Sequence, residues 1–116
     1  MNSIKTIADL KIQLLKAYNI DTVNSKYKEK WNKNNPTYGQ CAITSILVQN
    51  LFGGDIYKLE KENHYYNFIN GEIIDLTKEQ FDCELDYSSG IKRIKAFDEE
   101  TMGRYKKLKD LLDASK

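Results

Sequence analysis

A cysteine stands at the point where the chain changes from polar turn formers to an apolar run. The stretch NPTYGQCAITSILVQNLFGG covers residues 35–54, and Cys41 is the first residue of its apolar part. An apolar run that ends at two glycines predicts a buried helix, so Cys41 falls in the first turn of that helix. The free backbone N–H groups and the helix dipole there favour the ionised thiol, which is the nucleophilic form of cysteine. The sequence therefore offers Cys41 as a nucleophile.

A nucleophilic cysteine needs a base, and His64 is the one histidine of the chain. It begins the run HYYNFI, which is followed by Asn70-Gly71 and EIIDL, and Asn-Gly is the dipeptide that best suits a two-residue type I′ hairpin turn. This turn sets Tyr66 opposite Asp75. Because side chains alternate along a strand, His64 and Asp75 then share one face as diagonal neighbours, about 7 Å apart at the backbone. The spacing predicts a Cys-His-Asp triad in which Asp75 orients the imidazole.

The carbonyl oxygen in such a reaction becomes an oxyanion, which needs hydrogen-bond donors close to the nucleophile. Gln40 is the candidate side chain, together with the backbone N–H of Cys41. Gln40 fits equally well as a residue that closes the turn before the helix, and Asn34 or Asn35 then supplies the side-chain donor.

Each candidate residue also has a purely structural interpretation. Cys41 fits a small buried apolar residue, because free cysteine is among the most buried residue types. His64 fits a partly exposed strand residue, and Asp75 fits the polar end of a strand before a helix cap. Cys83 follows the hairpin and belongs to no motif, so we expect its thiol to have no function.

Length and composition limit the classes of protein to consider. The 116 residues predict a single domain over residues 1–116, and a hydrophobic content of 41% favours a folded chain. A net charge of +1 gives no support for nucleic-acid binding. The lysine-interrupted start and the lack of a long apolar run predict a cytoplasmic protein without membrane contact. In that compartment two free thiols are expected, and without help from carboxylates they do not form a structural zinc site with one histidine. We expect no metal and no organic cofactor.

Three helices are expected around the cysteine. Apolar residues at steps of three and four predict a first helix that ends near Asn19, with an inner stripe of Ile4, Ile7, Leu10, Leu14 and Tyr18. The helix over Cys41–Phe52 should be the central one, and its buried residues should be Ile43, Ile46, Leu47 and Leu51. A charged helix over Asp98–Ala114 should turn inward Met102, Tyr105, Leu108, Leu111 and Leu112.

The segment between the second and third helices has the pattern of an antiparallel sheet. DIYKLE, HYYNFI and EIIDL are rich in β-forming residues, and SSGIKRIKAF predicts a further turn and strand. Thr77, with Gln80 three residues later, predicts a capping box for a short helical turn through Phe81. Helices followed by antiparallel strands place the chain in the α+β class.

The motifs around the candidate triad resemble a known family. NPTYGQCAITSILVQNLFGGDI and NHYYNFINGEIIDLTKEQF resemble the YunG family of small bacterial proteins, whose members show a Trp, an Asn-Pro, a Gly-Gln-Cys, a double glycine, a His-Tyr and an Asp-Leu-Thr followed by Gln-Phe. The match covers roughly residues 31–81, and Tyr66 stands where a Trp is expected. More distantly, Gly-Gln-Cys at a helix start followed by His and Asp on strands is similar to papain-like and transglutaminase-like cysteine enzymes. That resemblance implies a buried central helix packed on a small antiparallel sheet, and acyl transfer or amide hydrolysis.

Two hypotheses on function follow. The first is a cysteine-dependent acyl-transfer enzyme, acting as a peptidase, deamidase or transferase, in which Cys41 attacks a carbonyl carbon and His64 moves the proton. The second is a non-catalytic binding or inhibitory module on a papain-like scaffold. Both imply a protein or peptide as substrate or partner. Small size favours the module, because 116 residues leave little chain for substrate subsites, whereas the presence of all three triad residue types favours the enzyme. The oligomeric state, and the role of the C-terminal helix, stay open.

Overall fold

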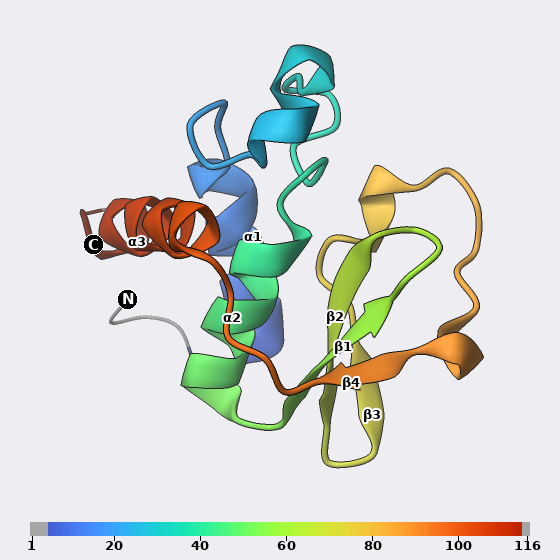
Figure 1. The fold of residues 1–116 in the computed structure, drawn as a ribbon. Helices are drawn as coiled ribbons and strands as arrows, with labels where there is room; N and C mark the ends of the chain where they lie inside the picture. Colours follow the sequence, from blue (N-terminus) through green and yellow to red (C-terminus); the bar gives the residue numbers. More distant parts are fainter. Residues whose placement is uncertain (1–4, 115–116) are drawn as a thin grey trace.

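A computed structural model describes residues 5–114 of the chain. Three α-helices lie on one side of a four-stranded antiparallel sheet, and α2 is between the sheet and the other two helices (Figure 1). The helices are α1 (Ile7–Ala17), α2 (Cys41–Phe52) and α3 (Glu99–Ala114). The α+β class predicted from the order of helices and strands is confirmed.

The sheet has the strand order β3-β2-β1-β4 and all its pairings are antiparallel. Its strands are β1 (Asp55–Leu59), β2 (His64–Ile69), β3 (Glu72–Ile74) and β4 (Ile91–Arg93). Short 3-10 turns η1 (Ser25–Lys30), η2 (Lys78–Gln80) and η3 (Tyr87–Ser89) lie in the connections. The β-rich runs named from the sequence all form strands, and the turn before the last one is η3.

The hairpin of β2 and β3 has the predicted two-residue turn. Ile69 pairs with Glu72, and the two residues between them both have positive φ, 52° at Asn70 and 81° at Gly71. A type I′ turn requires positive φ at both positions, which Asn and Gly adopt more readily than other residues. The register read from the sequence is therefore confirmed for this hairpin.

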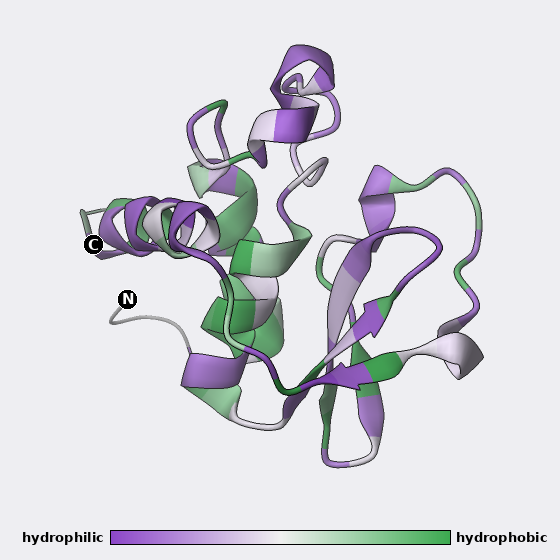
Figure 2. Cartoon of the chain, viewed as in Figure 1, coloured by the Kyte–Doolittle hydropathy of each residue, from purple (hydrophilic) through white to green (hydrophobic). Residues whose placement is uncertain are grey.

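The core lies between α2 and its neighbours on both sides. Figure 2 shows α2 as hydrophobic over most of its length, whereas α3 is mixed. The buried cluster joins residues of the three helices and the sheet, namely Leu10, Leu14, Tyr18, Ile43, Ile46, Leu47, Val48, Ile56, Ile69, Tyr105, Leu108 and Leu112. Ile74 packs against this cluster, as expected for a residue near α2. A helix covered on both sides explains why almost every position of α2 is apolar or small.

For three residues, the prediction that the side chain lies in the core is wrong. Leu51 is 38% exposed, and Met102 and Leu111 are each 41% exposed. Leu51 lies in the last turn of α2, beyond most of the residues that α2 buries, and the other two lie at the margin of the inner stripe of α3. Ile4, which was assigned to the stripe of the first helix, lies outside the described residues. The other inner positions of α1 are buried or pack on the core.

Candidate functional site

Cys41 is the first residue of α2, as the sequence predicted, and it is 9% exposed. The backbone in front of it is fixed by Gly39, whose φ is +72°. A Cβ at this glycine would lie 2.5 Å from Cγ2 of Val23, so no other residue fits without displacing its neighbours. The position of the thiol is therefore set by a tight turn on one side and a buried helix on the other.

His64 begins β2, has no exposed surface, and contacts Asp75 directly. Its Nε2 atom lies 2.7 Å from Oδ2 of Asp75. The strand ladder ends at the pair Asn67–Ile74, so Tyr66 and Asp75 are opposite in register but are not a strand pair as predicted. The chain leaves β3 at this point, which frees Asp75 to turn towards the imidazole. The structure thus brings together the two residues that the hairpin register predicted as neighbours.

Two further donors hold the carboxylate of Asp75. The Tyr87 hydroxyl donates to Oδ2 at 2.7 Å, and the backbone N–H of Thr77 donates to Oδ1 at 3.3 Å. Burial raises the pKa of Tyr87 well above its ordinary value, and the hydrogen bond to Asp75 raises it further, so the hydroxyl keeps its proton and donates it. A carboxylate held by two donors in addition to His64 has little freedom to rotate away from the ring.

The contact with Asp75 determines which nitrogen of His64 faces the cysteine. With Nε2–H donating to the carboxylate, Nδ1 is left as the acceptor of the neutral ring. Burial alone lowers the pKa of His64, but the hydrogen bonds to Asp75 and to the Cys41 thiol, with the charges of both, outweigh it and raise the pKa to about 9. Asp75 and Cys41 therefore both favour the protonated form of His64.

Gln80 belongs to the site, although the sequence predicts a different role for it. It was expected to complete a capping box with Thr77, but the Thr77 side chain makes no capping hydrogen bond. Instead, Oε1 of Gln80 accepts from the backbone N–H of Gly39 at 3.3 Å, and its Nε2 donates to the Thr77 carbonyl at 3.1 Å and lies 3.4 Å from Nδ1 of His64. Gln80 thus ties the turn before Cys41 to the histidine. The one sequence signal for this role is that Gln80 belongs to the Gln-Phe pair among the motifs that resemble the YunG family.

Gln40 is fully buried, and it is not among the residues that line the cavity at Cys41. Its Nε2 donates to the carbonyl of Asn19 at 3.4 Å, and no described group lies within hydrogen-bond distance of its Oε1. The alternative donors Asn34 and Asn35 do not line the cavity at Cys41 either. Among the side-chain amides considered, Gln80 is the one that reaches both this cavity and His64.

A cavity of about 220 Å³ opens beside Cys41. Its walls come from η1, the turn before α2, the first residues of α2, the turn between β1 and β2, the start of β2, and η2, each with adjoining residues. The lining residues are Asn24, Tyr27, Tyr38, Gly39, Cys41, Ala42, Glu62, Asn63, Tyr65, Gln80 and Phe81. The ring of Phe81 packs edge-on against His64 at 4.9 Å between centroids. A small reactant in this cavity would contact the sulfur directly.

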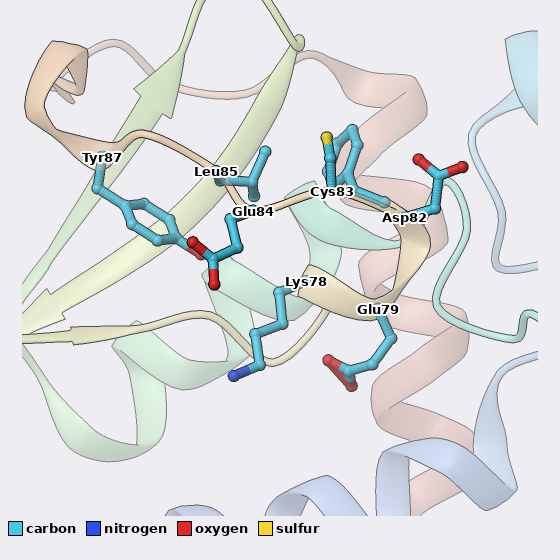
Figure 3. Close-up of a pocket in the computed structure, with 8 residues that line it drawn as sticks. Lys78, Glu79, Asp82, Cys83, Glu84, Leu85 and Tyr87 are labelled. Carbon is cyan, nitrogen blue, oxygen red and sulfur yellow. The ribbon is translucent and has the colours of Figure 1, made fainter.

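A second, larger hollow of about 620 Å³ involves the loop that follows η2. Figure 3 shows its lining side chains, with Lys78 and Glu79 on η2, Cys83 and Glu84 on the loop, and Tyr87 at the start of η3. It meets the site through Tyr87, which binds Asp75. Cys83 is exposed here and Cys41 does not line this hollow, so the two thiols have different surroundings.

Within residues 5–114, no cluster of three or more His, Cys, Asp or Glu side chains could hold a metal ion. Over the same residues, none of the helices has the length and apolar character needed to cross a membrane.

The chain matches the sequence model of the family described as YunG protein over residues 6–115. It is similar to the protein named "Uncharacterized protein YunG" from Bacillus subtilis (strain 168), with 42% identity over 60 residues, which are 50% of this chain and 52% of that protein. The match thus spans about half the length of this curated relative. No solved structure matches the chain significantly. Because the family match covers nearly all of the sequence, the chain belongs to the YunG family.

Proposed function

We propose that the protein is a cysteine-dependent acyl-transfer enzyme that uses Cys41, His64 and Asp75. The observation that carries this proposal is that Asp75 holds Nε2 of His64 at 2.7 Å while the Cys41 thiol is close enough to raise the pKa of the same ring. A purely structural buried histidine needs no thiol beside it. A cysteine at a helix start is followed in the chain by a histidine on a strand and an acid just after the next strand. This order is similar to that of papain-like enzymes, and we extend the proposal to a papain-like scaffold.

The reaction begins with proton transfer from the thiol to Nδ1 of His64. The thiolate attacks the carbonyl carbon, an S–C bond forms, and the electron pair of the carbonyl moves to its oxygen. When the C–N bond breaks, the imidazolium gives its proton to the leaving amine, which leaves a thioester on Cys41. His64 then takes a proton from water, or from another acceptor, which attacks the thioester and releases the thiolate.

The oxyanion is stabilised by donors at the start of α2. The first backbone N–H groups of a helix have no partner within it, so the N–H of Cys41 is suitably placed to donate. For the second donor we favour Gln80 over Gln40, because Gln80 lines the cavity and Gln40 does not. The amide of Gln80 has to turn from the Thr77 carbonyl or from His64 to donate to the oxyanion. Gln40 acts in its place only if its side chain leaves Asn19.

The test is the reaction with p-nitrophenyl acetate in a Cys83→Ser protein, which keeps Cys41 as its one thiol. We expect a burst of nitrophenolate, an acetyl group on Cys41 by mass spectrometry, and then slower steady turnover as the thioester is hydrolysed. His64→Ala should abolish both phases. If Cys41 acylates no faster than Cys83 does in a Cys41→Ser protein, the enzyme proposal fails and the non-catalytic module becomes the better account.

A natural substrate is best sought by trapping. Cys41→Ala keeps the cavity but cannot form the thioester, so a protein or peptide substrate should copurify with it and not with a Cys83→Ala control. Mass spectrometry of the bound material then distinguishes a peptidase, a deamidase and a transferase.

A further inference from the structure

Glu62 is the one charged side chain among the residues that line the cavity at Cys41. It lies in the turn between β1 and β2, just before His64. The turn is fixed by Asn63, whose φ is 51° and whose backbone N–H donates to the carbonyl of Glu60 at 3.2 Å. The side-chain amide of Asn63 also donates to the Tyr27 hydroxyl at 3.3 Å, which joins the turn to η1. The backbone that carries Glu62 is therefore held in place at this cavity.

The ion pairs found within residues 5–114 leave Glu62 without a cation. Lys58 and Arg93 are near, since each lies over the Tyr65 ring at 5.3 Å from its centroid, but neither lines the cavity. Lys58 pairs with Glu60 at 3.7 Å. Arg93 lines an adjoining hollow of about 380 Å³, where Lys26, Asp98 and Glu100 supply charges of both signs. The wall of the Cys41 cavity thus carries one negative charge and no positive one, whereas the charges of the adjoining hollow balance.

The rest of the cavity wall suits a cation as well. Tyr27 and Tyr38 meet edge to face at 5.3 Å between centroids, and Tyr65 and Phe81 add further rings. Aromatic faces attract ammonium and guanidinium groups, and they also cover the apolar stem of such a side chain. A volume of about 220 Å³ lies below the roughly 300–1,000 Å³ of ordinary ligand sites, which suits one side chain rather than an extended peptide.

We propose that this cavity selects substrates that carry an amine or guanidinium group next to the carbonyl attacked by Cys41, with Glu62 as the residue that binds the cation. This inference rests on the proposed acyl-transfer function. It adds a specificity residue in front of His64 that takes no part in proton transfer.

The test compares three methanethiosulfonate reagents of similar reactivity in the Cys83→Ser protein. The methyl reagent is neutral, the 2-trimethylammoniumethyl reagent is cationic and the 2-sulfonatoethyl reagent is anionic. In each case the thiolate of Cys41 attacks the sulfenyl sulfur, a new S–S bond forms, and methanesulfinate leaves with the electron pair. The ratio of the cationic to the anionic rate reports the charge in the cavity, whatever the intrinsic reactivity of the thiol.

We expect Glu62→Gln to lower this ratio roughly tenfold, because it removes the charge of the cavity wall that the sulfur shares. Glu60→Gln is the matched control, since it makes the same charge change in the same turn, on a residue outside the cavity wall, and should leave the ratio nearly unchanged. In the unmutated cavity, raising the salt concentration should lower the ratio only partly, because a partly buried charge is screened less than an exposed one.

An equal fall in both variants would overturn the proposal, since it would show long-range charge rather than a site. An unchanged ratio in Glu62→Gln would do the same. These outcomes are distinct from failure of the acyl-transfer proposal, which is recognised by a slow reaction with the neutral reagent that His64→Ala does not alter. Circular dichroism shows whether the variants are folded. If Glu62→Gln does not fold, the salt dependence of the rate ratio in the protein that keeps Glu62 still tests the proposal.

Discussion

Nε2 of His64 lies 2.7 Å from Oδ2 of Asp75, and the same carboxylate oxygen accepts a hydrogen bond from the Tyr87 hydroxyl at 2.7 Å. One oxygen atom thus fixes both the tautomer of the histidine and the position of the loop that carries Tyr87. In the proposed mechanism this arrangement directs Nδ1, which also lies 3.4 Å from the Gln80 amide, to the thiol of Cys41, and Asp75 is a positioning residue.

Asp75→Asn should slow acylation of Cys41 by p-nitrophenyl acetate at least about tenfold, because an amide permits the wrong tautomer of His64. Asp110→Asn, on the exposed side of α3, makes the same change far from the site and should have no effect. Tyr87→Phe removes one of the donors to Asp75 and should give a smaller loss. Equal acylation rates in Asp75→Asn and Asp110→Asn would remove Asp75 from the mechanism.

Stability should fall as the pH rises from about 6.5 to about 9. The pKa of His64 is about 9 in the folded protein against 6.5 ordinarily, so its stabilising charge is fully present below pH 6.5 and is lost as the pH passes the folded value. Urea denaturation under reducing conditions should show a decline of up to about 3 kcal/mol relative to a His64→Gln protein over this range. Parallel pH profiles for the two proteins would contradict the raised pKa.

Leu47→Ala should destabilise the fold by about 2–5 kcal/mol, because Leu47 has no exposed surface and lies in the core between α2 and its neighbours. Leu51→Ala is the matched control on the same helix. Leu51 is 38% exposed, and we expect its substitution to change the free energy of unfolding by about 0.5 kcal/mol or less. Denaturant titration of both variants measures these changes. Equal losses in the free energy of unfolding would mean that α2 does not pack with Leu47 inward and Leu51 at the surface.

Gln80→Ala and Gln40→Ala should differ in a way that identifies the oxyanion donor. Ester acylation develops an oxyanion and alkylation by iodoacetamide does not, so loss of a donor slows the first reaction more than the second. For Gln80→Ala we expect a loss of roughly 10²–10³ in acylation and a much smaller loss in alkylation. If Gln40→Ala, and not Gln80→Ala, loses more in acylation than in alkylation, the oxyanion donor is Gln40. If Gln80→Ala loses equally in both reactions, Gln80 only positions its neighbours.

Local signals explain what the sequence revealed about this site. Asn70-Gly71 specifies a turn by its backbone preferences alone, and the turn fixes the register that brings His64 near Asp75. Cys41 could be placed because the change in residue type before it marks the start of α2. Each of these inferences depends on residues close together in the sequence.

The role of Gln80 and the exposure of Leu51 depend on contacts between distant segments. Gln80 follows Thr77 at the spacing of a capping box, but its side chain makes hydrogen bonds to Gly39 and His64, which only the folded chain brings near. Leu51 has the periodicity of a buried residue, yet the elements that cover α2 do not bury its last turn. Propensity gives a weak prior that tertiary packing overrides.

The division of the site between a helix and a hairpin has a consequence for how the protein acquires reactivity as it folds. His64 and Asp75 belong to one hairpin, a unit that closes in about 1–10 μs, so base and orienter meet early. Cys41 joins them only when α2 docks on the sheet, which is a long-range event and therefore slow. On the proposed mechanism, a newly made chain therefore carries an unactivated thiol until α2 docks on the sheet, and the rate at which Cys41 becomes reactive reports the final docking step.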